Sequence, residues 1–133
     1  MVIYKGTRLN EDLMNGAPED TIFAASPKGH MDSDLFYTWF VKFVANIPPR
    51  RPVLLILDGH ASHLSRETLL LAKENKVHFL VLPPHTTHIF QPWDVGDFGP
   101  LKKAFSEACT KLMRRNKRKY INRYDFCKVL TPA

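Results

Sequence analysis

Two aspartates are the residues of this sequence whose type and spacing point to chemistry. Asp58 directly follows the apolar run Val53–Leu57, and Asp94 follows the run Val77–Leu82 across a proline-containing loop. If the two runs are neighbouring parallel strands, both carboxylates lie at the carboxyl edge of the sheet, where α/β proteins bind ligands. Carboxylate oxygens bind hard divalent cations, and two cations about 4 Å apart support phosphoryl transfer. The alternative is that each Asp is a turn or cap residue.

Positive charge is concentrated near the C-terminus. The net charge is +6, and residues 102–119 carry eight basic side chains against the single acid Glu107. Such an excess favours non-specific contact with DNA phosphates, with a solvated helix face as the alternative. The run Arg114–Lys119 also matches a nuclear localisation signal, so we expect a nuclear protein. The residues predicted to bind nucleic acid are Lys102, Lys103, Lys111, Arg114, Arg115, Lys117, Arg118 and Lys119.

Four histidines form two His-x-x-His pairs beside the two aspartates. The pairs are His60 with His63 and His85 with His88. Structural zinc sites usually include cysteine, and Cys109 and Cys127 lie elsewhere in the chain. We therefore favour polar loop residues over a zinc module, and we expect His63 to support Asp58.

The strongest helix prediction precedes Asp58. Apolar residues from Leu35 to Ile47 keep one broad face apolar, and Trp39, Phe40 and Phe43 are expected in the core. Asp32 or Ser33 is placed to cap this helix, and Pro48-Pro49 ends it.

A βαβ unit is predicted to position the aspartates. Ser65 caps a second helix that runs to about Asn75, between the two apolar runs. A strand–helix–strand order of this length forms a right-handed crossover. Because the first run is apolar without alternation, we expect it to be buried on both faces.

Shorter elements are predicted at the two ends. Val2–Lys5 has the pattern of a strand end, Asn10–Asp20 that of a loop, and Thr21–Ala25 that of a short strand before a turn. Pro100 lies in the first turn of a last helix. Its apolar stripe is Leu101, Phe105, Ala108 and Leu112.

The composition narrows the class of protein. The sequence has no apolar run near the ~20 residues of a membrane helix, and its first residues lack the pattern of a signal peptide. Two cysteines make no disulfide framework, which favours a reducing intracellular compartment. We expect neither a membrane nor a small-molecule substrate as partner.

Two long motifs resemble those of the pogo/Tigger transposases, a group of the DDE superfamily. Leu57–His63 is similar to their second-Asp motif, and Leu82–Gly96 to their third-Asp motif. Phe98–Lys102, Val2–Gly6 and Gly29–Phe36 are similar to other segments of the same family. The resemblance covers about residues 1–115, with both motifs in the right order and at the right spacing.

The resemblance implies a metal-dependent site. Asp58 and Asp94 match the second and third metal-binding catalytic aspartates, and Mg²⁺ or Mn²⁺ is the cofactor of the intact domain. No residue matches the first aspartate, which in the family lies upstream of the segment that begins at Met1. Trp93 stands where the family usually has Leu. The residues expected to support the metal ligands are His63, Gln91 and Thr87.

The implied fold is α/β, a partial ribonuclease-H-like fold with a βαβ half and a C-terminal helix. The family sheet has the order 3-2-1-4-5, and strands 1 and 2 are expected to be missing, which leaves an apolar edge and a poorly stable fragment. Residues 1–115 are the expected partial catalytic domain, and 116–133 a basic extension. The predicted function is that of a nucleic-acid-binding fragment of a transposable-element-derived DDE transposase, inactive alone. The alternative is a domesticated, non-enzymatic DNA- or protein-binding module.

Overall fold

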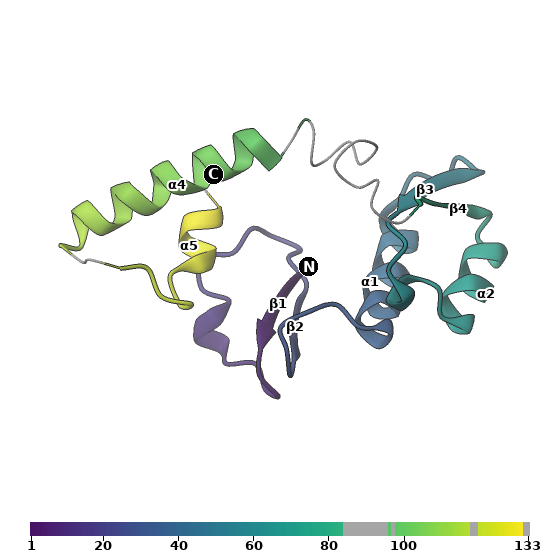
Figure 1. Cartoon of the computed structure of the whole chain (residues 1–133), viewed down its shortest axis with the longest axis horizontal. Helices are drawn as coiled ribbons and strands as arrows, with labels where there is room; N and C mark the ends of the chain where they lie inside the picture. The colour runs from purple at the N-terminus through teal and green to yellow at the C-terminus, as the bar shows by residue number, and fades with distance from the viewer. Residues whose placement is uncertain (84–95, 97, 118–119, 132–133) are drawn as a thin grey trace.

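The computed structural model describes residues 1–83, 96, 98–117 and 120–131. Figure 1 shows two groups of elements. One group contains the N-terminal strands together with the C-terminal helices. The other contains the middle of the chain, and it carries Asp58.

The middle group confirms the elements predicted around Asp58. Helix α1 (Ser33–Asn46) begins at the cap Asp32, whose carboxylate accepts a hydrogen bond of 2.9 Å from the Leu35 N–H. The remaining elements are β3 (Val53–Leu57), the 3-10 turn η2 (Ala61–His63), α2 (Arg66–Glu74) and β4 (Val77–Val81). Ser65 caps α2 by accepting from the Thr68 N–H, as the sequence predicts.

Strands β3 and β4 are parallel and in full register. Val53 pairs with Val77, and Leu57 pairs with Val81. Helix α2 connects them, so the predicted βαβ unit is confirmed. In this register the carboxyl ends of the two strands lie side by side.

The core of this group lies between the helices and one face of the strand pair. Phe36 and Phe40 of α1 are buried against Leu57, Ala72 and Val77. The Phe40 ring meets the Phe79 ring edge-on, with centroids 5.3 Å apart. The other aromatic side chains of α1 predicted for the core, Trp39 and Phe43, are partly buried beside this cluster.

The prediction that β3 is buried on both faces is wrong. Leu54 is 60% exposed and Ile56 is 44% exposed, whereas Leu55 packs against the core. Leu80 of β4 is exposed as well. Since α1 and α2 both pack on the same side of the pair, alternate side chains are left facing outward.

The N-terminal strands pair with each other. β1 (Val2–Lys5) is parallel to β2 (Phe23–Ser26), with Val2 opposite Phe23. The second strand therefore begins two residues later than Thr21, where the sequence placed it, and the 3-10 turn η1 (Glu11–Leu13) lies within the predicted loop. After β2 the chain turns at Gly29, whose φ is +74° and where a Cβ would lie 3.2 Å from the Lys5 side chain.

The C-terminal helices belong to this same group. Helix α4 (Phe98–Arg115) contacts the short helix α5 (Phe126–Leu130), and the rings of Phe105 and Phe126 lie 5.7 Å apart. No side chain of α4, which the structure describes throughout, is fully buried. The predicted stripe is therefore only half covered, and Leu101 at its start is exposed.

Helix α5 is anchored to β1 and η1. Cys127 and Val129 are buried, and the Tyr4 hydroxyl donates a hydrogen bond of 2.9 Å to the Leu13 carbonyl, 3.5 Å from Cys127 Sγ. Burial, and then the hydrogen bond with Cys127, raise the pKa of Tyr4 well above its usual range. The phenol is therefore neutral over the physiological range and acts as a packing and hydrogen-bonding group.

The architecture is mixed α/β, with parallel strand pairs, a βαβ half and a C-terminal helix. It is the predicted partial ribonuclease-H-like fold. Within the described residues, no helix has the length and apolar character that spanning a bilayer requires.

Candidate functional site

Asp58 lies at the carboxyl end of β3, beside the point where β4 ends. The Leu82 N–H donates a 2.8 Å hydrogen bond to the Leu57 carbonyl, which extends the strand pairing by one residue. A Cβ at Gly59 would lie 3.4 Å from the Leu82 carbonyl oxygen, so the two strand exits run close together. The loop that leads to Asp94 therefore begins next to Asp58.

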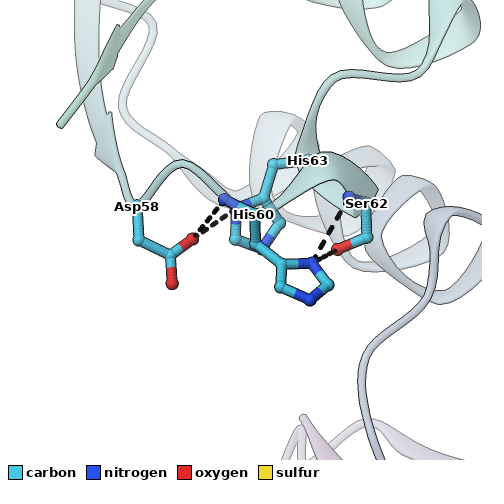
Figure 2. Close-up of polar contacts among 4 residues, drawn as sticks. All are labelled: Asp58, His60, Ser62 and His63. Carbon is cyan, nitrogen blue, oxygen red and sulfur yellow. Dashed lines mark hydrogen bonds and ion pairs between the residues drawn. The ribbon is translucent and has the colours of Figure 1, made fainter. Parts of the chain in front are cut away.

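The Asp58 carboxylate is held by the turn that follows it (Figure 2). Its Oδ1 atom accepts a 3.2 Å hydrogen bond from the His60 backbone N–H and lies 2.9 Å from His63 Nδ1. The side chain is 42% exposed. Both contacts are made by Oδ1. Among the described residues nothing occupies Oδ2, so this oxygen is open to an incoming ligand.

His63 is fixed by helix α1. Its side chain is only 15% exposed, and its ring lies 4.4 Å from the Phe36 ring, which is buried in the core. The Nδ1 atom lacks the angular geometry of a hydrogen bond, so its approach to Asp58 is an electrostatic contact that is strongest when the imidazole is protonated. The structure thus brings His63 beside Asp58, and its supporting role stays a prediction.

His60 has a structural task in this turn. Its Nδ1 atom caps η2 by accepting from the Ser62 backbone N–H, and it also lies 2.7 Å from Ser62 Oγ (Figure 2). Ser62 is buried. Because Nδ1 is engaged in the cap, His60 shapes the loop that presents Asp58.

Several predicted site residues lie outside the described residues. They are Asp94, Gln91, Thr87, Arg118 and Lys119, together with His85 and His88 of the second histidine pair. The distance between the two aspartates and the zinc hypothesis therefore stay untested.

The described residues hold one of the two predicted metal ligands, Asp58. Across residues 1–83, 96, 98–117 and 120–131, no group of three or more His, Cys, Asp or Glu side chains is arranged to hold a metal ion. Asp58 offers an oriented, accessible carboxylate oxygen, which is the ligand type that Mg²⁺ and Mn²⁺ prefer. The residues present therefore fit one ligand position of such a site.

The described basic residues that were predicted to bind nucleic acid are all exposed. Helix α4 carries five of them, and the sixth lies two residues after its end. They are Lys102, Lys103, Lys111, Arg114, Arg115 and Lys117. In Figure 1 the helix is the long green ribbon, well separated from β3 and β4.

Sequence reasoning missed the contacts that hold this site in place. Phe36 was predicted only as part of the apolar face of its helix, yet its ring also packs against His63. The signal was present, since Gly29–Phe36 is one of the segments that resemble the family. Helix α5 was not predicted at all, because five residues are too few to show a helical period.

Comparison with known proteins assigns a family. A protein of Cochliobolus lunatus named MFS-type transporter clz9 is 37% identical over 99 residues, which are 72% of this chain and 11% of that protein. The chain therefore spans about a tenth of the length of this curated relative. No solved structure matches the chain. The family model of the DDE superfamily endonucleases matches residues 1–131, and the chain belongs to this family.

Proposed function

We propose that this chain is a nucleic-acid-binding portion of a transposase-derived DDE endonuclease of the pogo/Tigger group, and that it does not cleave DNA by itself. Endonucleases of this superfamily act on nucleic acid with divalent metal ions. The proposal extends to a C-terminal part of the catalytic domain over residues 1–115, a basic extension over 116–133, and a nuclear location. The transporter name of the relative describes a much longer protein.

The observation that carries the binding proposal is the exposed basic surface of α4. Six cations in the segment 102–117 are accessible to a polyanion, against one acid, Glu107. A helix face that carries both positive and negative charges would simply be solvated. This excess of positive charge attracts phosphates instead, without contacts that depend on the base sequence. We therefore expect DNA binding that is weak, salt-sensitive and largely independent of sequence.

The observation that limits catalysis is the incomplete set of carboxylates. Asp58 and Asp94 would hold Mg²⁺ or Mn²⁺, which activates a water and stabilises the leaving 3′ oxygen when bound. No residue of this sequence matches the first aspartate of the family. Asp32 is no substitute, because its carboxylate caps α1, and Asp34 lies in the first turn of the same helix.

A plasmid-nicking assay tests this proposal. Pure protein is incubated with supercoiled DNA and Mg²⁺ or Mn²⁺, with Asp58→Ala as the matched variant. We expect no nicking above the level of the variant, while DNA binding by the same preparation persists at low salt. Metal-dependent nicking that Asp58→Ala abolishes would overturn the claim of inactivity.

A second candidate function is a non-enzymatic protein-binding module. The exposed Leu54, Ile56 and Leu80 side chains on one face of the β3–β4 pair favour it, because a contiguous apolar surface is typical of protein contacts. A folded chain that neither binds nor nicks DNA would favour this candidate over the first.

A further inference from the structure

A notch between α4 and α5 gathers positive charge from two separate helices. It has a volume of about 290 Å³. Lys111 and Arg115 line it from α4, and Lys128 lines it from α5. Residues four apart on a helix lie on the same face, so the two α4 cations point to the same side. Lys128 was not among the basic residues predicted to bind nucleic acid.

The position of Lys128 is set by the fold. Its neighbours Cys127 and Val129 are buried, and Cys127 contacts Tyr4 of β1 and the Leu13 carbonyl of η1, which fixes α5 there. The Lys128 Cγ atom lies 3.0 Å from the point where a Cβ at Gly16 would be. The aliphatic part of the Lys128 side chain therefore packs directly against the Gly16 backbone. The Thr131 hydroxyl donates to the Gly16 carbonyl and ties the end of α5 to the same place.

The lining of the notch is positively charged overall. Within the described part of the chain, no carboxylate lies within ion-pair distance of Lys111, Arg115 or Lys128. Glu107 lines the notch without pairing with them, and the small side chain of Ala108 leaves room between the helices. Three cations and one acid give the notch a net positive charge.

We propose that this notch is a seat for one phosphate group of a nucleic acid backbone. Arg115 offers a planar pair of N–H donors to phosphate oxygens, while Lys111 and Lys128 add ammonium groups from two directions. The notch orients the backbone along α4, whereas the other exposed cations of the helix attract it without a fixed geometry. The inference rests on the proposed nucleic-acid binding and names a specific contact for it.

The test compares two variants that lose the same charge. The first replaces Lys111, Arg115 and Lys128 by Gln, and the control replaces Lys102, Lys103 and Arg114 by Gln. The control residues are exposed on α4 and do not line the notch. Affinity for a short fluorescein-labelled duplex DNA is measured by fluorescence anisotropy at fixed salt. We expect the notch variant to lose about tenfold more affinity than the control, the effect of one charge-assisted hydrogen bond.

A variant of opposite sign adds a second readout. Glu107→Gln removes the one acid of the notch and should tighten DNA binding, whereas Glu74→Gln, on the distant helix α2, should not. Equal losses in the two triple variants, or no gain from Glu107→Gln, would overturn the seat and leave general DNA binding intact.

Inorganic phosphate separates failure of the seat from failure of the proposed function. If the wild-type chain does not bind duplex DNA, the proposed function fails. A phosphate titration followed by amide chemical shifts then decides the seat alone. Shifts centred on Lys111, Arg115 and Lys128 would support an anion seat that serves free phosphate. Uniform or absent shifts would refute it.

Discussion

Replacing Val129 by Ala should loosen the N-terminal strand pair and leave the βαβ unit unchanged. Val129 is 1% exposed, on a helix whose Phe126 and Cys127 contact Tyr4 of β1 and whose Cys127 also contacts the Leu13 carbonyl of η1. The substitution deletes two methyl groups, which at ~0.8 kcal/mol each is about 1.6 kcal/mol. The cavity left behind raises the cost to roughly 2–3 kcal/mol, because the surroundings collapse only in part.

Amide hydrogen exchange measures this effect residue by residue. The Val2 N–H donates to the Ile22 carbonyl at 2.8 Å, and the Gly6 N–H donates to the Ser26 carbonyl at 2.9 Å. A loss of about 2 kcal/mol in local stability corresponds to roughly thirty-fold faster exchange at these two amides.

The matched control acts on the other group of elements. Val77→Ala also removes two methyl groups, from a side chain that is 5% exposed in the core of the βαβ unit. It should accelerate exchange of the Val53 and Leu82 amides, which bond to Lys76 and Leu57 carbonyls. If Val129→Ala accelerates exchange equally in both groups, the two unfold as one unit and our reasoning is refuted.

Three further substitutions have defined expectations. Asp32→Ala removes the α1 cap that accepts from the Leu35 N–H and should cost about 1 kcal/mol in urea unfolding. Gly16→Ala should cost at least ~1 kcal/mol, because φ is +79° there and the new Cβ meets Lys128. Leu54→Thr should change the unfolding free energy by less than about 0.5 kcal/mol and reduce self-association in light scattering, since this side chain is exposed on the open sheet face.

Each of these substitutions has a control in which the same type of residue is replaced at a position that lacks the contact under test. Asp34→Ala removes a first-turn carboxylate that does not cap α1, and Gly99→Ala adds a Cβ that meets nothing within 4 Å. Leu55→Thr changes the same strand on its core side. The cap argument is wrong if Asp34→Ala lowers the free energy of unfolding as much as Asp32→Ala does. The glycine argument is wrong if Gly99→Ala lowers it as much as Gly16→Ala, and the exposed-face argument is wrong if Leu55→Thr is as mild as Leu54→Thr.

The βαβ unit was predictable because its signals are local. Asp32 and Ser65 mark helix starts through their own hydrogen bonds to backbone N–H groups. Continuous apolar runs mark strands, and they do so whichever face is covered. The same run therefore could not reveal that Leu54 and Ile56 would be exposed, since that depends on which elements pack on the sheet.

The packing of the N-terminal group, unlike its strands, was not predictable from local pattern. Its packing joins Tyr4 to Cys127 over a sequence separation of 123 residues, through a helix of five residues. Within the candidate site, the proximity of His63 to Asp58 followed from their spacing and the family resemblance. The use of His60 as a cap for η2 did not, because it depends on the backbone angles of the turn.

The most direct test of the account is the salt dependence of DNA binding by the pure chain. Binding of a labelled duplex is measured by anisotropy from low to high salt, beside a variant with Gln at the six exposed cations of residues 102–117. We expect log K to fall linearly with log salt, with a slope of roughly −0.9 for each phosphate neutralised, and the variant to flatten this slope. Binding that is independent of salt, or that survives unchanged in the variant, would contradict it.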